Sequence, residues 1–372
     1  MQEVSQQALA QAVEAFACEY QNPLAQSYGS GHINDTYLVT GKCGGPAQAN
    51  SRLILQRINT DIFVHPEQVL ENISRVTEHI RTALQAEGKD PGRGTLTLMP
   101  SQEGKLAYVD CDGGWWRCYL FVEDTVSFDK VERPEDFYSS ALAFGHFQKQ
   151  LADFPAETLH ETIPAFHDTR KRFADFKKAV AEDVVGRAAG AAAEIQFVLD
   201  HEADARYFAE LLERGELPLR VTHNDTKLNN ILMDKATGEA ICVIDLDTVM
   251  PGLAINDYGD SIRFGASTAL EDERDLDKVW LDLELFEVYT KGFIEGCEGS
   301  LTGAELDNLP MAAKGMTLEC GMRFLADHLQ GDVYFKVHRE GHNLDRARTQ
   351  FKLVADMEAK WEQMQQIVAK YR

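Results

Sequence analysis

The sequence predicts an α+β fold built in two parts, residues 1–122 and residues 123–372. A chain of 372 residues is long enough for two lobes with separate cores. Up to about residue 120, short apolar runs are bounded by Gly, Asn and Thr, which is typical of strands. After residue 124, apolar residues recur at helical spacing over longer segments. We therefore expect a first part that is mainly antiparallel sheet with one helix, and a second part that is mostly helical.

Strands account for most of the first part. Candidate strands lie at residues 36–40, 52–59, 94–100, 105–110 and 115–124, and the last is too apolar for an exposed edge. A Gly-rich stretch, YGSGHIN at residues 28–34, predicts a turn before the first of these. One helix is expected over residues 66–85, because Val69, Ile73, Val76 and Ile80 recur at helical spacing.

Helices dominate the second part. The first is expected over residues 134–154, with buried positions at Phe137, Leu142, Phe144, Phe147 and Leu151. Further helices are expected over residues 206–214, 277–293 and 346–371, and in the Ala-rich stretch 186–195. Between these helices, the apolar runs 231–233 and 240–246 flank the turn sequence KATGE and predict a β-hairpin.

Charge and cysteine content exclude several classes of function. The formal net charge of −23 repels phosphate backbones, so neither nucleic acid nor an anionic membrane surface is expected as a partner. The N-terminus has no basic segment followed by an apolar one, and no apolar run approaches 18 residues, so a cytoplasmic protein is expected. Seven Cys without a C-x-x-C pair suggest neither a disulfide framework nor a zinc site.

The most informative stretch is VTHNDTKLNNILMD, residues 221–234, in which a His, two acids, a Lys and three Asn lie beside apolar residues. If the hairpin closes over residues 235–238, its register places Asn230 opposite a residue one or two from Asp245. An amide oxygen and a carboxylate at that separation suit Mg²⁺, which takes its remaining ligands from water and substrate phosphates. The hairpin therefore predicts a metal site at Asn230 and Asp245.

Asp225 lies five residues before Asn230, where a base for an incoming hydroxyl group is expected. The pattern H-x-D-x-x-x-x-N, followed about fifteen residues later by I-D, matches the catalytic loop of kinases. His223 is expected to brace this loop, and Asp247 is a secondary candidate for the metal. A single acid or Asn in a loop more often serves a turn or a cap. The ordered set of four instead predicts phosphoryl transfer, which needs positioning and charge neutralisation but no Cys or Ser nucleophile.

The segments HNDTKLNNIL and VIDLDTVMPG resemble the aminoglycoside phosphotransferase and choline kinase superfamily, which implies a two-lobed protein-kinase-like fold with ATP in the cleft. GSGHINDTY, LILQRIN, DYGDSIRFGA and GMRFLADHLQGDVYFK, with HNLDRARTQ, are similar to bacterial N-acetylhexosamine 1-kinases. The resemblance extends from residue 29 to about residue 350. It implies an enzyme of carbohydrate metabolism that uses ATP and Mg²⁺ to phosphorylate the anomeric hydroxyl of GlcNAc or GalNAc, giving the sugar 1-phosphate.

The resemblance places nucleotide binding in residues 1–122 and catalysis and sugar binding in residues 123–372. The GSGHIN loop, residues 29–34, is expected to cover the ATP phosphates, although by itself it is equally a hairpin turn. Kinases hold phosphates with a Lys on the third strand, paired with a helix Glu; here Gln56 or Arg57 occupies that strand, and alternation points them to opposite faces. The expected nucleotide-binding residues are Gly29, Gly31, His32, Asn34, Arg57, Glu71 and the hinge residues Phe121, Val122 and Glu123.

The sugar is expected to contact Asp225, Asp260, Arg263, Arg323 and Tyr334. Arg323 and Tyr334 lie in the GMRFL and GDVYF segments, whose Arg and Tyr reach the sugar in the resembling kinases. A guanidinium group suits hydroxyl or acetamide oxygens, and a tyrosine gives an amphipathic wall. The alternatives are a structural ion pair for Asp260 and Arg263 and a core aromatic role for Tyr334.

Two rival functions stay open. The first keeps the chemistry and changes the acceptor to glucosamine or another sugar, choline, homoserine or an aminoglycoside. The second is a catalytically silent nucleotide-binding regulator, favoured by the missing strand Lys and disfavoured by the presence of Asp225, Asn230 and Asp245. The sequence does not decide the preferred sugar, the use of GTP or the oligomeric state.

Overall fold

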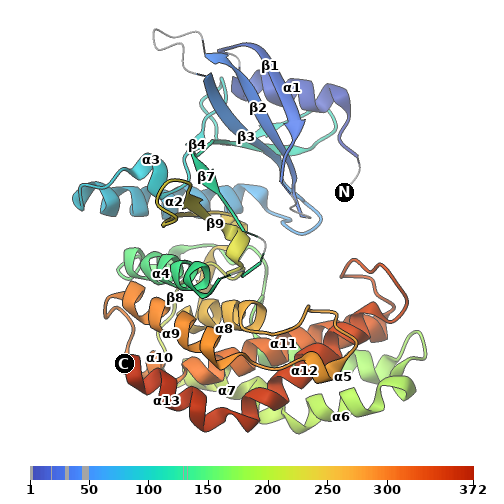
Figure 1. The fold of residues 1–372 in the computed structure, drawn as a ribbon. Helices are drawn as coiled ribbons and strands as arrows, with labels where there is room; N and C mark the ends of the chain where they lie inside the picture. The colour runs from blue at the N-terminus through green and yellow to red at the C-terminus, as the bar shows by residue number, and fades with distance from the viewer. Residues whose placement is uncertain (1–2, 18, 30–32, 44–49, 129, 132) are drawn as a thin grey trace. The chain divides into compact units, whose positions relative to one another are not determined.

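The computed structural model describes the whole chain except residues 1–2, 18, 30–32, 44–49, 129 and 132 (Figure 1). The chain forms two compact units. The first unit comprises residues 1–126, 159–164 and 232–249, and the second comprises residues 127–158, 165–231 and 250–372. The mixed α+β composition predicted from the sequence is confirmed. In the part of the chain that the structure describes, no helix is both long and apolar enough to span a membrane.

The first unit holds most of the strands. Its helices are α1 (Gln6–Ala17), α2 (Pro66–Ala86), α3 (Pro91–Gly94) and the 3-10 helix η4 (Leu246–Thr248). Its strands are β1 (Tyr20–Ser27), β2 (Asp35–Cys43), β3 (Asn50–Arg57), β4 (Leu98–Met99), β5 (Tyr108–Val109), β6 (Trp115–Leu120), β7 (Thr125–Val126), β9 (Ile231–Asp234) and β10 (Ala240–Val243).

An antiparallel sheet of order β1-β2-β3-β6-β4, with β5 also on β6, forms the centre of the first unit. Helix α1 covers one face, where Phe16 packs in a cluster with Leu55 and Cys118 (Figure 1). Side chains alternate across a strand. Gln56 and Arg117, which are paired across β3 and β6, therefore lie on the opposite face of the sheet.

A smaller sheet of order β10-β9-β7 completes the first unit. The β9–β10 hairpin closes with the Asp234 amide donating to the carbonyl of Glu239 at 2.8 Å. Strand β7 pairs with β9 at Thr125 and Val126. The predicted hairpin is confirmed, and η4 follows it directly.

The second unit is mostly helical, as the sequence predicts. Its longer helices are α4 (Pro134–Gln150), α5 (Thr169–Glu182), α6 (Ala192–Asp200), α7 (Glu202–Glu213), α8 (Ala254–Gly265), α9 (Leu283–Cys297), α11 (Leu309–Gln330), α12 (His342–Ala359) and α13 (Trp361–Tyr371). Its short elements are α10 (Gly303–Asp307), η1 (Ala156–Thr158), η2 (Ala188–Ala191), η3 (Leu228–Asn230), η5 (Leu276–Lys278) and the paired strands β8 (Arg220–Thr222) and β11 (Met250–Gly252).

Glycines let two pairs of helices in the second unit approach closely. A Cβ added to Gly145 of α4 would lie 2.5 Å from the main-chain oxygen of Phe293 on α9. A Cβ on Gly296 of α9 would overlap the main-chain oxygen of Leu142. At the crossing of α8 and α11, a Cβ on Gly259 would overlap the main-chain oxygen of Ala312. Interiors are close-packed, so these crossings exclude even a methyl group unless the backbones move.

Several boundaries differ from the sequence prediction. Helix α1 was not expected, because Ala8 and Ala12 on its buried face are small and give a weak hydrophobic period. The strand expected over residues 115–124 ends at Leu120, and the strand expected over 240–246 ends at Val243. The single helix expected over residues 346–371 is broken at Lys360 into α12 and α13. The Ala-rich stretch begins as the 3-10 helix η2 before α6.

Candidate active site

The residues from His223 to Asn230, between β8 and β9, form a loop that we call the 223–230 loop. The ring of His223 is fully buried and lies edge-on against Phe144 and Phe147, with centroids 5.5 and 6.0 Å away. Its Nδ1 accepts the main-chain N–H of Asp225 at 3.2 Å, so this nitrogen carries no hydrogen. The ring therefore orients the backbone at Asp225 from the core, which is the bracing contact expected from the sequence.

The carboxylate of Asp225 is held by two neighbours in the same loop. Lys227 Nζ lies 2.7 Å from one oxygen, and the amide nitrogen of Asn230 donates to the other at 3.2 Å. The Asp225 side chain nevertheless stays 25% exposed. The structure thus brings together Asp225 and Asn230, as predicted, and adds Lys227, whose role the sequence pattern did not indicate.

Two buried carboxylates on α8 fix the main chain of this loop. Asp257 accepts the N–H groups of His223 and Asn224 at 2.9 and 2.8 Å. Asp260 accepts the N–H of Thr226 at 3.1 Å. Charged acceptors make strong hydrogen bonds to main-chain donors, especially when they are buried. Helix α8 therefore acts as the support on which the 223–230 loop is built.

The charges around this support are strongly coupled. Burial raises the pKa of Asp257, although the hydrogen bonds that it accepts partly offset this effect. Burial also works to raise the pKa of Asp260, but the cations of Arg263 and Lys227 outweigh it and hold that pKa below its usual range. Burial lowers the pKa of Lys227, and the carboxylate of Asp225 more than offsets it, so that pKa is raised. The cations therefore keep Asp260 ionised beside the loop.

Asp260 and Arg263, expected at the substrate, are both buried and bind each other with N–O distances of 2.9 and 3.1 Å. Arg263 also pairs with Glu271 at 2.9 Å. This is the structural ion pair that the sequence left as an alternative. A direct contact of Asp260 or Arg263 with the acceptor stays a prediction.

Left-handed main-chain conformations occur beside two of the predicted functional residues. Asn224, directly before Asp225, has φ of 67°, and Asp245 itself has φ of 59°. Such values are uncommon for residues other than Gly and often mark functional loops. Strand β10 ends at Val243 and Asp245 directly precedes η4, so Asp245 does not lie on the strand expected over residues 240–246.

Asp247 lies in η4 and is 4% exposed. Its carboxylate forms an ion pair with Arg117 and accepts the Asn34 amide nitrogen at 2.5 Å. The side chain of Asn34 in turn accepts the N–H of Asn59 at 2.9 Å. Asn34, predicted at the nucleotide, is thereby attached to the residue two positions beyond Asp245. Gly29, in the same predicted phosphate loop, has φ of 78°, while Gly31 and His32 lie outside the described residues.

Arg57 was expected to hold phosphates with Glu71 as its partner. The structure instead places Arg57 on the face of the sheet covered by α1, where its Nη2 lies 2.6 Å from Asp35. Gln56, on the other face, accepts hydrogen bonds from Arg117 at 2.8 and 3.0 Å. This placement argues against Arg57 as the phosphate cation. Arg117 was missed, and its signal was a single charged residue within the apolar run WWRCYLF.

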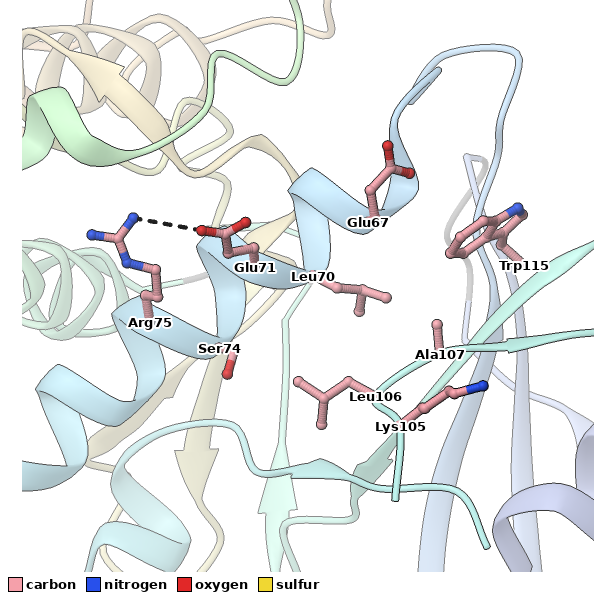
Figure 2. Close-up of a pocket in the computed structure, with 9 residues that line it drawn as sticks. All are labelled: Glu67, Leu70, Glu71, Ser74, Arg75, Lys105, Leu106, Ala107 and Trp115. Atoms are coloured by element: carbon pink, nitrogen blue, oxygen red, sulfur yellow. Dashed lines mark ion pairs between the residues drawn. The ribbon is translucent and has the colours of Figure 1, made fainter. Parts of the chain in front are cut away.

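Glu71 lies on α2 at the edge of a surface hollow of about 430 Å³ (Figure 2). Figure 2 shows its ion pair with Arg75, 3.9 Å long, and the apolar side chains of Leu70 and Leu106 in the hollow. Glu71 also lies 2.9 Å from His160 Nε2. Glu71 thus pairs with Arg75 and His160, and its expected role beside a nucleotide stays a prediction.

The predicted hinge residues Phe121, Val122 and Glu123 follow β6 rather than continuing it. The guanidinium of Arg52 lies 4.0 Å from the centroid of the Phe121 ring and forms an ion pair with Glu123. Arg93 donates to the main-chain oxygen of Glu123 at 3.0 Å. These contacts fix the segment, and its pairing with adenine stays a prediction.

Arg323 and Tyr334 lie together in the second unit, as predicted. The Arg323 guanidinium carbon lies 5.4, 5.9 and 5.5 Å from the ring centroids of Phe166, Tyr334 and Phe335. Among the described residues, no carboxylate lies within ion-pair distance of this guanidinium. Tyr334 is 61% exposed, which excludes the core aromatic role.

A buried pair that the sequence did not indicate connects this region to the 223–230 loop. His167 Nδ1 lies 2.8 Å from Glu319, and its Nε2 lies 3.3 Å from the main-chain oxygen of Asn224. Thr169 donates to the other Glu319 oxygen at 2.6 Å. Glu319 precedes Arg323 by one turn of α11, so Asp225 and Arg323 are linked through side chains of one unit. No motif in the sequence marks His167 or Glu319, because their pairing depends on tertiary packing.

A sequence model described as the phosphotransferase enzyme family matches residues 25–279. Among solved structures, an aminoglycoside phosphotransferase from Alicyclobacillus acidocaldarius aligns with a TM-score of 0.60 at 14% identity, covering 100% of this chain and 98% of the other. A microcompartment-associated aminopropanol kinase aligns with a TM-score of 0.55 at 16% identity, covering 96% and 98%. A spectinomycin phosphotransferase in complex with ADP and spectinomycin aligns with a TM-score of 0.54 at 13% identity, covering 97% and 100%. At these identities the similarity shows the fold, which is that of the protein-kinase-like phosphotransferases.

Proposed function

Because the chain belongs to the phosphotransferase enzyme family, we propose that it transfers the terminal phosphoryl group of ATP to the anomeric hydroxyl of an N-acetylhexosamine. The family makes it a phosphotransferase with an alcohol acceptor. The finer assignment, to GlcNAc or GalNAc and to the sugar 1-phosphate as product, rests on the acceptor region around Arg323 and on the sequence resemblance in the GMRFL and GDVYF segments.

Asp225 is the proposed catalytic residue. Its carboxylate, oriented by Lys227 and Asn230 and still partly exposed, would accept the proton of the sugar hydroxyl as the oxygen attacks the phosphorus. The nearby ammonium of Lys227 would stabilise the negative charge that the attacking group brings to the loop. The backbone supports from Asp257 and Asp260 keep this geometry fixed in advance of substrate binding.

Asn230 and Asp245 are the proposed Mg²⁺ ligands. Asn230 uses its amide nitrogen to bind Asp225, so its amide oxygen, the atom that a hard cation needs, points away from that bond. An amide oxygen and a carboxylate match the donor preference of Mg²⁺. When bound, the metal would neutralise charge on the ATP phosphates. The role of the chain in this step is to present these two oxygens from a loop and a hairpin end of fixed conformation.

The pairing of charges beside the loop is the observation that favours a neutral acceptor. The carboxylates of Asp257, Asp260 and Glu319 already accept hydrogen bonds from groups of the chain. The guanidinium of Arg323, by contrast, forms no ion pair among the described residues and lies against three aromatic rings. An ammonium group of an acceptor would be repelled there, whereas hydroxyl and acetamide oxygens would be bound.

The assignment is tested by ³¹P and ¹H NMR of reactions with Mg·ATP and GlcNAc, GalNAc, glucosamine, glucose or choline. We expect a phosphorus signal coupled to the anomeric proton with GlcNAc or GalNAc and no transfer to choline. The Arg323→Met variant should raise the KM for the sugar about 10-fold or more while leaving the KM for ATP nearly unchanged, since one charge-assisted hydrogen bond contributes about 1.5–3 kcal/mol. Transfer to choline but not to the sugars would overturn the acceptor assignment.

A second candidate is an amino-alcohol kinase, because one structural neighbour is an aminopropanol kinase. It shares the proposed roles of Asp225, Asn230 and Asp245. Aminopropanol belongs in the same NMR panel for this reason. If aminopropanol is the acceptor, the Arg323→Met variant should improve its binding by removing a like charge, which is the reverse of the result expected for a sugar.

A further inference from the structure

Arg117 is the charged residue of β6, and its side chain is only 1% exposed. Two of its nitrogens donate to Gln56 at 2.8 and 3.0 Å, and a third forms the ion pair with Asp247, whose side chain is 5% exposed. Burial works to lower the pKa of Arg117, but Asp247 and other neighbours outweigh it, so the pKa is raised and the group stays charged. Such a pair is costly to bury and indicates a role other than stability alone.

The position of Arg117 follows from strand pairing. Gln56 and Arg117 are direct partners across β3 and β6. Kinases place a cation on the third strand. In this chain that strand carries Gln56, and the cation, Arg117, lies on the neighbouring strand β6 at the same face of the sheet. In this position the guanidinium binds the side-chain oxygen of Gln56 and a carboxylate of the chain, Asp247.

Asp247 in turn joins three segments that are far apart in the sequence. Its carboxylate binds Arg117 of β6 and Asn34 at the start of β2, and its main-chain oxygen accepts the hydroxyl of Thr162 at 3.4 Å. On the next turn of chain, Asn72 of α2 donates to the main-chain oxygen of Val249 at 2.9 Å. Residues 247–249 are thus anchored to the sheet, the predicted phosphate loop and α2 at once.

We propose that Arg117 is a positioning residue for the metal site: through Asp247 it fixes the segment that presents the carboxylate of Asp245. Asp247 is then an anchor and not a ligand of the cation, because both of its carboxylate oxygens already face donors of the chain. Asn34 shares this anchor, so the base of the predicted phosphate loop is tied to the same carboxylate. The inference rests on the proposed function, in which Asp245 binds the metal of the nucleotide.

The test compares the wild-type protein with Arg117→Met, Arg117→Lys, Asp247→Asn and the double variant Arg117→Met/Asp247→Asn. Arg117→Met leaves a buried carboxylate unpaired and is expected to lower the melting temperature. The double variant removes both charges and should recover most of that loss. Metal binding is measured as Mn²⁺ binding in the presence of ADP by electron paramagnetic resonance, and as the half-saturating Mg²⁺ concentration of the kinase reaction.

We expect the double variant to melt near the wild type and still to bind Mn²⁺ about 10- to 100-fold more weakly, which is the usual effect of disturbing a group that orients a metal ligand. Arg117→Lys should restore part of the affinity, since it keeps the charge but not the fork. The KM for the sugar should not change in any of these variants. Arg81→Met, which removes another cation of the first unit that pairs with Glu78 and Thr97, is the control and should bind Mn²⁺ as the wild type does.

Wild-type Mn²⁺ affinity in the double variant would overturn the proposal and reduce Arg117 and Asp247 to packing residues. Loss of metal binding in Asp247→Asn but not in either Arg117 variant would overturn it as well, because Asp247 would then be a ligand. Failure of the proposed function has a different signature. In that case the wild type phosphorylates none of the sugars, while the effect of Arg117 on Mn²⁺ and ADP binding is still measured and decides the inference.

Discussion

His167 and Glu319 form a buried pair that reaches the main chain beside Asp225. The two ring nitrogens of His167 face acceptors, the carboxylate of Glu319 at 2.8 Å and the carbonyl oxygen of Asn224 at 3.3 Å. An imidazole can donate to both only when both nitrogens carry hydrogen. The charge of Glu319 therefore influences the contact between His167 and the carbonyl oxygen of Asn224, the residue directly before Asp225.

Stability should depend on Glu319 in a pH-dependent way. Burial works to raise the pKa of Glu319, but His167, Arg323 and Thr169 outweigh it and hold that pKa below its usual range. A group with a lowered folded-state pKa contributes stability above its unfolded pKa and loses it as the pH falls through the folded pKa. Glu319→Gln should therefore lower the free energy of unfolding at pH 7 by about 2 kcal/mol, with the difference shrinking below about pH 4.5. Urea titrations at several pH values check this, and a difference that does not vary with pH would contradict it.

Asp225→Asn should lower kcat by about 10²- to 10⁴-fold, because Asn keeps the shape of the side chain but cannot accept the hydroxyl proton. The binding of Mg·ADP should be nearly unchanged, since Asp225 is not a proposed metal ligand. Steady-state kinetics and calorimetric titration with Mg·ADP separate the two effects. Glu340→Gln is the control, because it also replaces a carboxylate by an amide but at an exposed position of the second unit. Full activity of the Asp225→Asn variant would remove Asp225 from the mechanism.

The loop after α11 should depend on Asp327. The carboxylate of Asp327 accepts the N–H groups of Val333, Tyr334 and Phe335 at 2.9, 2.8 and 3.0 Å and thereby holds Tyr334 outward. Asp327→Ala removes these three bonds and a fourth, from the side-chain amide of Asn343 at 2.8 Å, and each bond to such a charged acceptor contributes about 1.5–3 kcal/mol. We expect a higher KM for the acceptor with little change in the KM for ATP. Tyr334→Phe is the companion variant. If Asp327→Ala changes only the melting temperature, the loop has no part in acceptor binding.

The α4–α9 crossing gives a prediction about folding that is independent of function. A methyl group at Gly296 would overlap the main-chain oxygen of Leu142, so Gly296→Ala should lower the free energy of unfolding by about 1–3 kcal/mol despite the better helix propensity of Ala. Gly190→Ala is the matched control, because nothing lies within 4 Å of a Cβ added there. Chemical denaturation of both variants checks the difference. Equal stability would show that the two helices can separate at little cost.

Thiol labelling should distinguish one cysteine from four others. Cys111 is exposed, whereas Cys118, Cys242 and Cys297 are buried and Cys320 is partly so. Burial raises the pKa of Cys118 and Cys242 to about 12 and that of Cys320 to about 11, and it raises the pKa of Cys297 as well. Since the thiolate is the nucleophile, iodoacetamide at about pH 8 should modify Cys111 well before these four in the folded protein. Peptide mass spectrometry before and after unfolding in urea checks the order.

The sequence predicts the contacts of the proposed active site that lie within one loop, but not the contacts between residues far apart in the chain. Asp225 and Asn230 are five residues apart, so their proximity follows from one loop and was predictable. Asp260 was expected at the sugar or in an ion pair with Arg263, but the hydrogen bonds of Asp257 and Asp260 to the 223–230 loop join residues more than 30 positions apart and were not predicted. Periodicity contains no information on such partners.

The choice between Gln56 and Arg57 shows a different limit. Alternation correctly predicts opposite faces for these neighbours, but only the packing of α1 decides which face is which. Helix α1 itself was missed because its buried side is largely alanine. The two errors are therefore connected. When the helix that covers one face of a sheet is not predicted, the side chains that point to the other face cannot be assigned either.

The left-handed backbone at Asp245 restricts what this position can become in evolution or by design. With φ of 59°, the position tolerates Gly, Asn and Asp, whereas most other side chains would add about 1–2 kcal/mol of strain. Of these three, only Asp carries a full negative charge. Few substitutions at this position therefore keep both the backbone conformation and the negative charge. Replacing Asp245 by Gly or Asn in a search for higher thermal stability would be expected to lower turnover. The left-handed backbone at Asp245 thus restricts the residue types that are tolerated at the proposed metal-binding position.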